Sequence, residues 1–150
     1  HDMKLLDNEG VDLVLVPEPG EIYPPNYQTR VEVYKLTAPL EGIHRPGHFL
    51  GVTTIITKLL NLFTPDRLYV GQKDAQQALA IQQLVSDLDY QVQVVVCPTL
   101  RDPDGVAMSS RNNYLTQTQR KAARVLYRAL PGAPSSGHRS SGRLPTKAAD

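Results

Sequence analysis

The sequence predicts an α/β fold that contains a parallel sheet, and two observations carry this prediction. Short runs of β-branched and aliphatic residues alternate along the chain with longer stretches in which apolar residues recur at helical spacing. In that order, each helix returns the chain to the start of the next strand, so neighbouring strands run parallel. The composition agrees, because 150 residues that are 41% hydrophobic and 21% charged are ordinary for a globular protein.

Four short segments are expected to form strands. Residues 11–16 are an almost continuous apolar run closed by Pro17, which is typical of a buried parallel strand. Residues 30–34 alternate between apolar and polar types, so they are expected to form a short strand with one wet face. Two further buried strands are expected at residues 67–70 and 92–96.

Three helices are expected, two from apolar periodicity and one from a capping signal. The clearest covers residues 52–63 and follows a loop at 42–47, in which Pro46 suits the first turn of a helix. A second helix is expected over residues 78–88. A third is expected over residues 116–130, because its first four residues, Thr-Gln-Thr-Gln, have the spacing of a capping box.

Charge and cysteine content restrict the partners and the compartment. The net charge of +1 gives no general attraction to nucleic acid or to acidic membranes, so we expect neither as a partner. The apolar runs are far shorter than a membrane span, and the N-terminus has no signal-peptide pattern. The single cysteine, Cys97, excludes an internal disulfide and is expected in the core rather than as a nucleophile. These features predict a cytoplasmic protein.

The composition changes at Pro131. From there to Asp150, proline, glycine, serine and arginine dominate, and Leu144 is the only large aliphatic residue. Such a segment cannot bury enough apolar surface to offset the entropy of ordering it. We therefore expect residues 131–150 to be disordered.

The sequence Gly71-Gln72-Lys73-Asp74, at the end of a predicted strand, is a candidate anion site. Glycine lets a ligand approach the backbone, lysine supplies a cation, and the helix that follows has positive partial charge at its N-terminus. The alternative is a plain strand-to-helix turn in which Asp74 caps the helix and Gln77 is its capping partner. Such loops are common in α/β folds, so the tetrapeptide taken alone favours the plain turn.

Residues 108–111, Met-Ser-Ser-Arg, are a second candidate anion site. Two hydroxyls and a guanidinium can clamp phosphates, whereas the alternative, favoured for the tetrapeptide alone, is a solvated polar loop. Ligands of parallel sheets bind at the carboxyl ends of the strands, and both candidate sites follow such ends. We predict that Lys73 and Arg111 meet at one bound triphosphate.

Other polar clusters do not predict a metal site. His44 and His48 are four residues apart, but a Pro-Gly pair separates them and no third ligand is evident. Asp102 and Asp104 resemble the start of a calcium loop, but an asparagine stands where that loop needs a bidentate glutamate. His48 is either a polar cap or a ligand contact, and Arg45 is either a surface charge or an anion contact.

Four segments, taken in order, resemble the pantothenate synthetase (pantoate–β-alanine ligase) family. They are Arg-Pro-Gly-His-Phe at 45–49, Lys-Leu-Leu-Asn-Leu-Phe at 58–63, Pro-Asp-Arg-Leu-Tyr-Val-Gly-Gln-Lys-Asp-Ala-Gln-Gln at 65–77, and Pro-Thr-Leu-Arg-Asp-Pro-Asp-Gly-Val-Ala-Met-Ser-Ser-Arg-Asn-Asn-Tyr-Leu at 98–115. The resemblance covers about residues 1–130. The combination is highly specific, although each segment alone is weak.

The resemblance implies an incomplete Rossmann-like parallel sheet of the nucleotidyltransferase superfamily. Residues 1–100 would form a partial nucleotide- and pantoate-binding domain, and residues 101–130 would begin a smaller C-terminal lid domain with a phosphate-covering loop. The family joins (R)-pantoate to β-alanine with ATP and Mg²⁺. Pantoate attacks the α-phosphate to give pantoyl adenylate and pyrophosphate, and the β-alanine amine then displaces AMP to give pantothenate.

The resemblance also implies roles for single residues. Lys73 would contact the ATP phosphates, and Asp74 would lie near the ribose and Mg²⁺, with no other protein group on the metal. Leu100 would offer its backbone to adenine, and Gln77 would hydrogen-bond pantoate. The implied ATP contacts are Gly71, Gln72, Lys73, Asp74, Leu100, Met108, Ser109, Ser110 and Arg111. Fixed donors stabilise charge that develops in a transition state, and the implied catalytic set is Lys73, Ser109, Ser110 and Arg111. Two residues would lie near the active site, Arg45 and His48.

The chain departs from the family at both ends. It looks cut at its N-terminus, where the family carries a His-x-Gly-His segment, and the tail from Pro131 does not resemble the lid domain. We therefore expect a fragment that is inactive or weakly active, from a protein that is a homodimer at full length. Alternatives are another adenylyl transferase of the superfamily, or a non-catalytic truncated product. A fusion to a cytidylate kinase is left open.

Overall fold

The computed structural model describes residues 2–130, and the contacts divide the chain into two compact units at Pro98. The first unit is residues 1–98 and the second is residues 99–150. The predicted disorder of residues 131–150 lies outside the described part of the chain.

The first unit contains a two-stranded parallel sheet. Strand β1 (Arg67–Gly71) pairs with strand β2 (Gln93–Cys97), and helix α6 (Ala75–Asp87) connects them. In this register Gly71 lies opposite Cys97, so both strands end at the same edge. The prediction of two parallel strands joined by a helix is confirmed.

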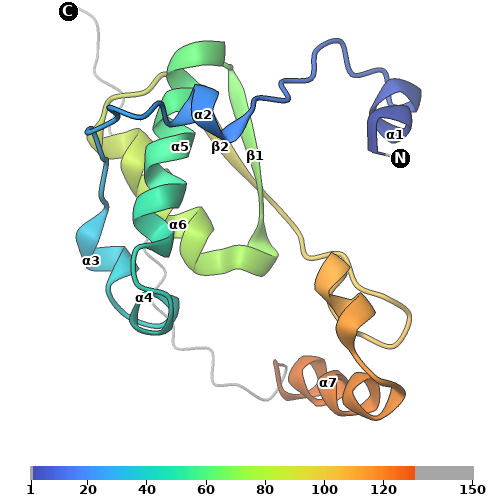
Figure 1. Cartoon of the computed structure of the whole chain (residues 1–150). Helices are drawn as coiled ribbons and strands as arrows, with labels where there is room; N and C mark the ends of the chain where they lie inside the picture. Colours follow the sequence, from blue (N-terminus) through green and yellow to red (C-terminus); the bar gives the residue numbers. More distant parts are fainter. Residues whose placement is uncertain (1, 131–150) are drawn as a thin grey trace, which may run out of the picture. The chain divides into compact units, whose positions relative to one another are not determined.

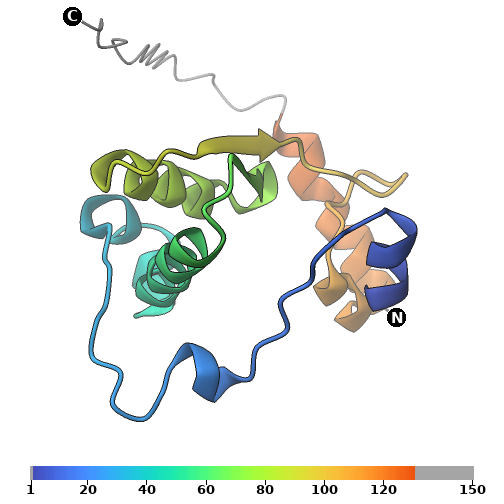
Figure 2. The same ribbon diagram turned by 90° about the horizontal axis from the view of Figure 1, so that it is seen from above.

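Helices α5 (His48–Phe63) and α6 pack side by side on one side of the strands (Figures 1 and 2). The buried core between them contains Leu60 of α5 and Leu84 of α6, with Leu68 of β1 packed against it. These are the apolar positions that the helical spacing predicts. The opposite face of β1 is open, because the side chain of Tyr69 is 59% exposed. The prediction that these strands are buried on both faces is therefore wrong for the described chain.

Residues 11–16 do not form the predicted strand. The segment has no regular secondary structure, and Leu13 and Val16 are 72% and 74% exposed. A strand needs a neighbour that shares its ladder hydrogen bonds. Within residues 2–130, β1 and β2 pair with each other and neither pairs with this segment.

Residues 30–34 also do not form the predicted strand, because threonine side chains take the place of a neighbouring strand. The N–H of Val31 donates to Oγ1 of Thr54 at 3.1 Å, and its carbonyl accepts from Oγ1 of Thr53 at 2.5 Å. Both threonines are buried on α5. Buried backbone polar groups need partners, and here a helix face supplies them.

Short helices fill the segments between these elements. The predicted loop at 42–47 is wrong in part, since its first residues belong to a one-turn helix and α5 begins at His48 rather than near Pro46. The bounds are α1 (Asp2–Asn8), α2 (Pro19–Ile22), α3 (Tyr34–Thr37) and α4 (Glu41–His44).

The second unit is a turn followed by two helices. In the turn, the N–H of Gly105 donates to the carbonyl of Asp102 at 2.8 Å. A 3₁₀ helix, η2 (Ser110–Tyr114), and helix α7 (Gln117–Ala129) follow. The predicted capping box is present, since the side chains of Thr116 and Gln119 each accept the backbone N–H of the other residue.

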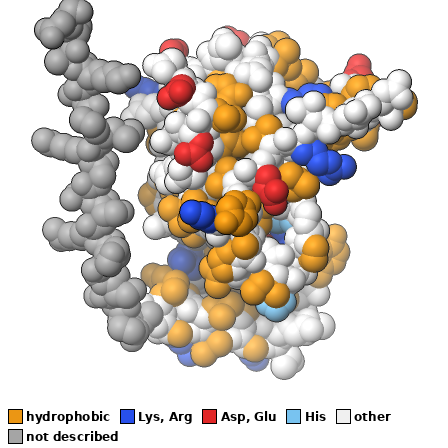
Figure 3. All heavy atoms as spheres, turned by 90° about the vertical axis from the view of Figure 1, so that its left-hand side faces the viewer, with side chains coloured by type: hydrophobic (Ala, Val, Ile, Leu, Met, Phe, Trp, Pro, Cys, Tyr) orange, Lys and Arg blue, Asp and Glu red, His pale blue; other side chains and the backbone are white. Residues whose placement is uncertain are grey.

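Many large apolar side chains are exposed. Figure 3 shows such side chains spread over one face, and the most exposed include Leu40, Ile43 and Tyr114. Within residues 2–130, none of the helices has both the length and the apolar content that a bilayer crossing needs.

Candidate functional site

The first candidate site lies where β1 ends. The chain leaves β1 at Gly71, makes one 3₁₀ turn, η1 (Gln72–Asp74), and enters α6. The Asp74 carboxylate does not cap α6 and instead lies 3.4 Å from Nζ of Lys73. The predicted capping of α6 by Asp74 and Gln77 is therefore wrong.

The geometry of this turn suits an anion. The first turn of α6 has backbone N–H groups with no side-chain cap, and these groups carry positive partial charge. Lys73 and Asp74 are exposed, with side chains 38% and 54% accessible to solvent. Their ion pair is weak at such exposure, so Lys73 can exchange the carboxylate for a phosphate. Gln77 lies half-buried one turn further along α6.

Gln76 connects this turn to the segment that carries Arg45. Its side-chain amide donates to the carbonyls of Leu36 and Pro39 at 2.9 and 2.8 Å, and accepts the N–H of Glu41 at 3.1 Å. No role for Gln76 was predicted from the sequence. The signal was slight, since an amide at the start of a helix usually faces solvent.

Arg45 is held through Glu41. Their side chains form an ion pair with a distance of 3.2 Å, and both are exposed. A tight contact holds the turn before them, because a Cβ on Gly42 would collide with the carbonyl oxygen of Thr37. His48 is half-buried at the start of α5, and its ring centroid is 5.1 Å from that of Phe49. The first unit thus links Arg45 to the start of α6.

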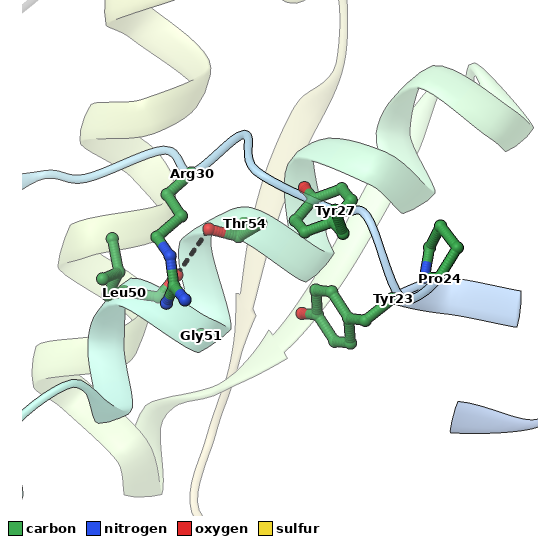
Figure 4. A pocket seen from close by; sticks show the side chains of 7 residues that line it. All are labelled: Tyr23, Pro24, Tyr27, Arg30, Leu50, Gly51 and Thr54. Atoms are coloured by element: carbon green, nitrogen blue, oxygen red, sulfur yellow. Dashed lines mark hydrogen bonds between the residues drawn. The ribbon is translucent and has the colours of Figure 1, made fainter. Parts of the chain in front are cut away.

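A hollow of about 340 Å³ lies beside α5 in the same unit (Figure 4). Tyr23 and Tyr27 wall one side and Arg30 reaches over Leu50 and Gly51 on the other. Lys58 of α5 holds the segment that carries the two tyrosines. Its ammonium donates to the carbonyl of Ile22 and lies 5.7 and 4.5 Å from the centroids of the two tyrosine rings.

The second candidate site is a loop closed by backbone hydrogen bonds. The N–H of Met108 donates to the carbonyl of Leu100 at 2.9 Å, and Arg101 and Ala107 form an antiparallel bridge. The side chains of Leu100 and Met108 are 72% and 54% exposed. The Leu100 carbonyl is therefore engaged by the backbone of Met108.

Ser109, Ser110 and Arg111 follow at the start of η2. The hydroxyl oxygen of Ser109 accepts the N–H of Arg111 at 3.3 Å, which leaves its own O–H free to donate to a phosphate. Ser110 and Arg111 are exposed. A hollow of about 470 Å³ is lined by Asp102, Met108, Ser109, Ser110, Asn112, Asn113 and Arg120. Lys73 and Arg111 lie in different units, so their meeting at one triphosphate remains a prediction.

Arg120 on α7 forms ion pairs with two carboxylates of this loop. Its guanidinium donates to Asp102 at 2.7 Å and to both oxygens of Asp104 at 2.8 Å. These hydrogen bonds lower the pKa of the Asp104 carboxyl to about 2, because they stabilise its charged form. They also raise the pKa of Arg120. The two aspartates were considered from the sequence as calcium ligands, and their arginine partner was not foreseen.

Among residues 2–130, no three histidine, cysteine, aspartate or glutamate side chains are gathered as a metal site. Cys97 is free and half-buried at the end of β2, where it was expected in the core.

Known sequences match this chain closely. The model of the family described as Pantoate-beta-alanine ligase matches residues 1–149. Pantothenate synthetase from Herpetosiphon aurantiacus is 56% identical over 132 residues, which are 88% of this chain and 48% of that protein. The enzyme of the same name from Thermotoga neapolitana is 53% identical over 129 residues, or 86% of this chain and 46% of that protein. The chain thus spans about half the length of these curated relatives.

Solved structures agree. Pantothenate synthetase from Thermus thermophilus has a TM-score of 0.83 at 50% identity, over 87% of this chain and 48% of that one. The ligase from Francisella tularensis, whose structure is described as a complex with β-γ ATP and β-alanine, has a TM-score of 0.78 at 40% identity, over 87% of this chain and 50% of that one. The Rossmann-like α/β architecture predicted from the sequence is thereby confirmed as an incomplete one. The chain belongs to the pantoate–β-alanine ligase family.

Proposed function

We propose that this chain carries part of the ATP site of an enzyme that joins pantoate to β-alanine. One observation supports this most directly: Lys73 stands at the end of β1, beside the uncapped N-terminus of α6. A lysine next to uncapped helical N–H groups is an arrangement of donors that binds phosphate. The related ligase from Francisella tularensis is described in complex with an ATP compound and β-alanine.

The proposed reaction has two steps. In the first, the pantoate carboxylate attacks the α-phosphate of ATP, the bond to the bridging oxygen breaks, and pyrophosphate leaves. In the second, the β-alanine amine attacks the acyl carbon of pantoyl adenylate, loses a proton and displaces AMP. Lys73, Ser109, Ser110 and Arg111 would stabilise the charge that develops on the phosphates, because donors fixed in place need no reorganisation as the charge appears.

The remaining proposed contacts bind and orient the substrates. Gln77 would hydrogen-bond pantoate, and Arg45 and His48 would lie near the reacting groups. Gly71, Gln72 and Met108 would contact ATP, with Leu100 at the adenine.

Mg²⁺ would enter with the nucleotide. This ion usually keeps several waters and binds through phosphate oxygens and one or two carboxylates, which is compatible with the single exposed carboxylate of Asp74 beside Lys73. When bound, Mg²⁺ withdraws charge from the phosphates during attack. Asp74 would hold one of its coordination positions.

We further propose that the full-length protein is a cytoplasmic homodimer. The extensive exposed apolar surface of the described chain supports association, since large exposed apolar patches commonly mark interfaces. Sedimentation of the full-length protein would test this, and a monomer at micromolar concentration would contradict it.

ATP binding and AMP release by the 150-residue chain test the function. We expect ATP binding by calorimetry, with turnover slow or absent because the chain spans about half of its relatives' length. Replacing Lys73 with Met should weaken ATP binding at least about tenfold, whereas Lys121→Met, at an exposed site on α7, should not. Equal effects of the two variants would overturn the site. Pyrophosphate release with phosphopantetheine or nicotinate mononucleotide in place of pantoate would overturn the substrate assignment.

A further inference from the structure

Arg120 binds two carboxylates of the loop that precedes the serine pair. It makes three hydrogen bonds of 2.7 to 2.8 Å to Asp102 and Asp104, and all three side chains are 27% to 29% exposed. A guanidinium has a planar, rigid set of donors, so it can fix two carboxylates relative to one another, which an ammonium cannot.

Hydrogen bonds, together with the peptide link between Val106 and Ala107, connect this ion cluster to the serines. Asp102 donates its N–H to Val106 at 2.9 Å within the turn. Ala107, the next residue, accepts from the side-chain amide of Asn112 at 2.9 Å. Asn112 in turn donates its N–H to the carbonyl of Ser109 at 3.0 Å. Anchoring the two aspartates on α7 therefore anchors the turn that presents Ser109.

A second contact between the loop and α7 lies near the first. The guanidinium of Arg101 stands 4.3 Å from the ring centroid of Tyr127 and donates to the carbonyl of Gly105 at 3.1 Å. A Cβ on Gly105 would collide with the same ring. The loop thus rests on α7 at two turns of the helix.

The ion cluster also sets the charge beside the serines. Asp102 and Arg120 line the same hollow as Ser109 and Ser110. Without Arg120, the Asp102 carboxylate would face that hollow uncompensated and repel a polyphosphate. Arg120 thus shapes the loop and offsets part of its negative charge.

We propose that Arg120 is a positioning residue that sets the affinity of the Ser109–Arg111 loop for the triphosphate group without contacting the nucleotide. This proposal rests on the ATP site proposed above. The proposal predicts a selective effect. Replacing Arg120 should lower the affinity for the phosphate groups and leave the affinity for the nucleoside unchanged.

Three variants of the 150-residue chain test this by calorimetry with ATP, tripolyphosphate and adenosine. Arg120→Gln should weaken the binding of ATP and of tripolyphosphate at least about tenfold, because losing a charge-assisted hydrogen bond typically costs about tenfold in affinity. The affinity for adenosine should change by less than about twofold. Arg120→Lys should recover part of the lost phosphate affinity, because lysine restores the positive charge but not the planar set of guanidinium donors. Arg128→Gln removes the same charge from an exposed position on the same helix and should have little effect. Equal losses for Arg120→Gln and Arg128→Gln, or an equal loss of adenosine binding, would overturn the proposal.

Hydrogen exchange separates this proposal from the ATP site itself, because it needs no nucleotide. The N–H groups of Met108 and Asn112 should exchange at least about tenfold faster in Arg120→Gln than in Arg128→Gln, provided that circular dichroism shows α7 intact. Unchanged exchange would overturn the positioning role even if ATP binds. Faster exchange in a chain that does not bind ATP would uphold the loop anchor and reject the nucleotide site.

Discussion

The side chain of Gln76 accepts the backbone N–H of Glu41 at 3.1 Å, across 35 positions of sequence. The same amide donates to two carbonyls of the preceding turn, so one side chain fixes the segment before Arg45 against the start of α6. Lys73 lies in the 3₁₀ turn that leads into α6, so Gln76 holds the segment that carries Arg45 close to the candidate phosphate site.

Replacing Gln76 with Ala should destabilise the first unit by about 1–3 kcal/mol, because three hydrogen bonds are lost together. Gln83→Ala is the matched control on the same helix, since Gln83 bonds only Asp87 one turn away among the described residues. Urea unfolding followed by circular dichroism measures both. Equal changes in the free energy of unfolding would show that the bridge does not bind the segment to α6.

The threonine pair of α5 offers a second test. Thr54→Val keeps the side-chain volume but leaves the N–H of Val31 without its acceptor, which should cost about 1–3 kcal/mol. Thr57→Val removes a hydroxyl that bonds a carbonyl of its own helix, and should change the free energy of unfolding by less than about 0.5 kcal/mol. The same unfolding measurement checks both. A Thr54→Val variant as stable as the parent would mean that water replaces the hydroxyl.

Two glycines should respond in opposite directions to alanine. Gly105 has φ of +88° and no room beside Tyr127, so Gly105→Ala should destabilise the second unit by about 1–3 kcal/mol. Gly51 lies within α5 with open space around it, so Gly51→Ala should stabilise by about 0.5–1 kcal/mol. Thermal unfolding of the two variants gives the signs directly. Stabilisation by Gly105→Ala would contradict the contact with Tyr127.

Acid should release the loop from α7. The hydrogen bonds from Arg120 lower the pKa of Asp104 from 3.8 to about 2, so between these values the unfolded chain binds more protons than the folded one. The stability that this pair contributes is therefore complete above about pH 4 and is lost as the pH falls toward 2. A carbon-detected NMR titration of the Asp104 carboxyl gives the pKa. A value at or above 3.8 would contradict the ion cluster.

Local pattern was sufficient for the elements whose stability comes from nearby residues. The capping box at Thr116 and the helical spacing of α5 and α6 were predicted, because each depends on residues a few positions apart. The parallel pairing of β1 and β2 followed from the helix between them. The family was also evident from sequence, since its motifs lie in unbroken segments.

Hydrogen-bond partners that are distant in sequence could not be predicted from the local sequence pattern. Residues 11–16 and 30–34 both have the pattern of strands, yet the first has no strand beside it within the described chain and the second is bonded to threonine hydroxyls of α5. Asp74 has the spacing of a cap but pairs with Lys73. In each case alternation or spacing describes what a segment could bond, whereas the partner is chosen by what the folded chain brings within reach.

The amino-acid sequence by itself determined the lineage, the α/β alternation and the residue types that could hold a triphosphate. Tertiary structure alone decided that Gln76 links Arg45 to α6 and that Arg120 binds Asp102 and Asp104. The physical reason is that a hydrogen bond requires two groups within about 3 Å. Separation along the chain says nothing about that distance until the backbone between the two groups has folded.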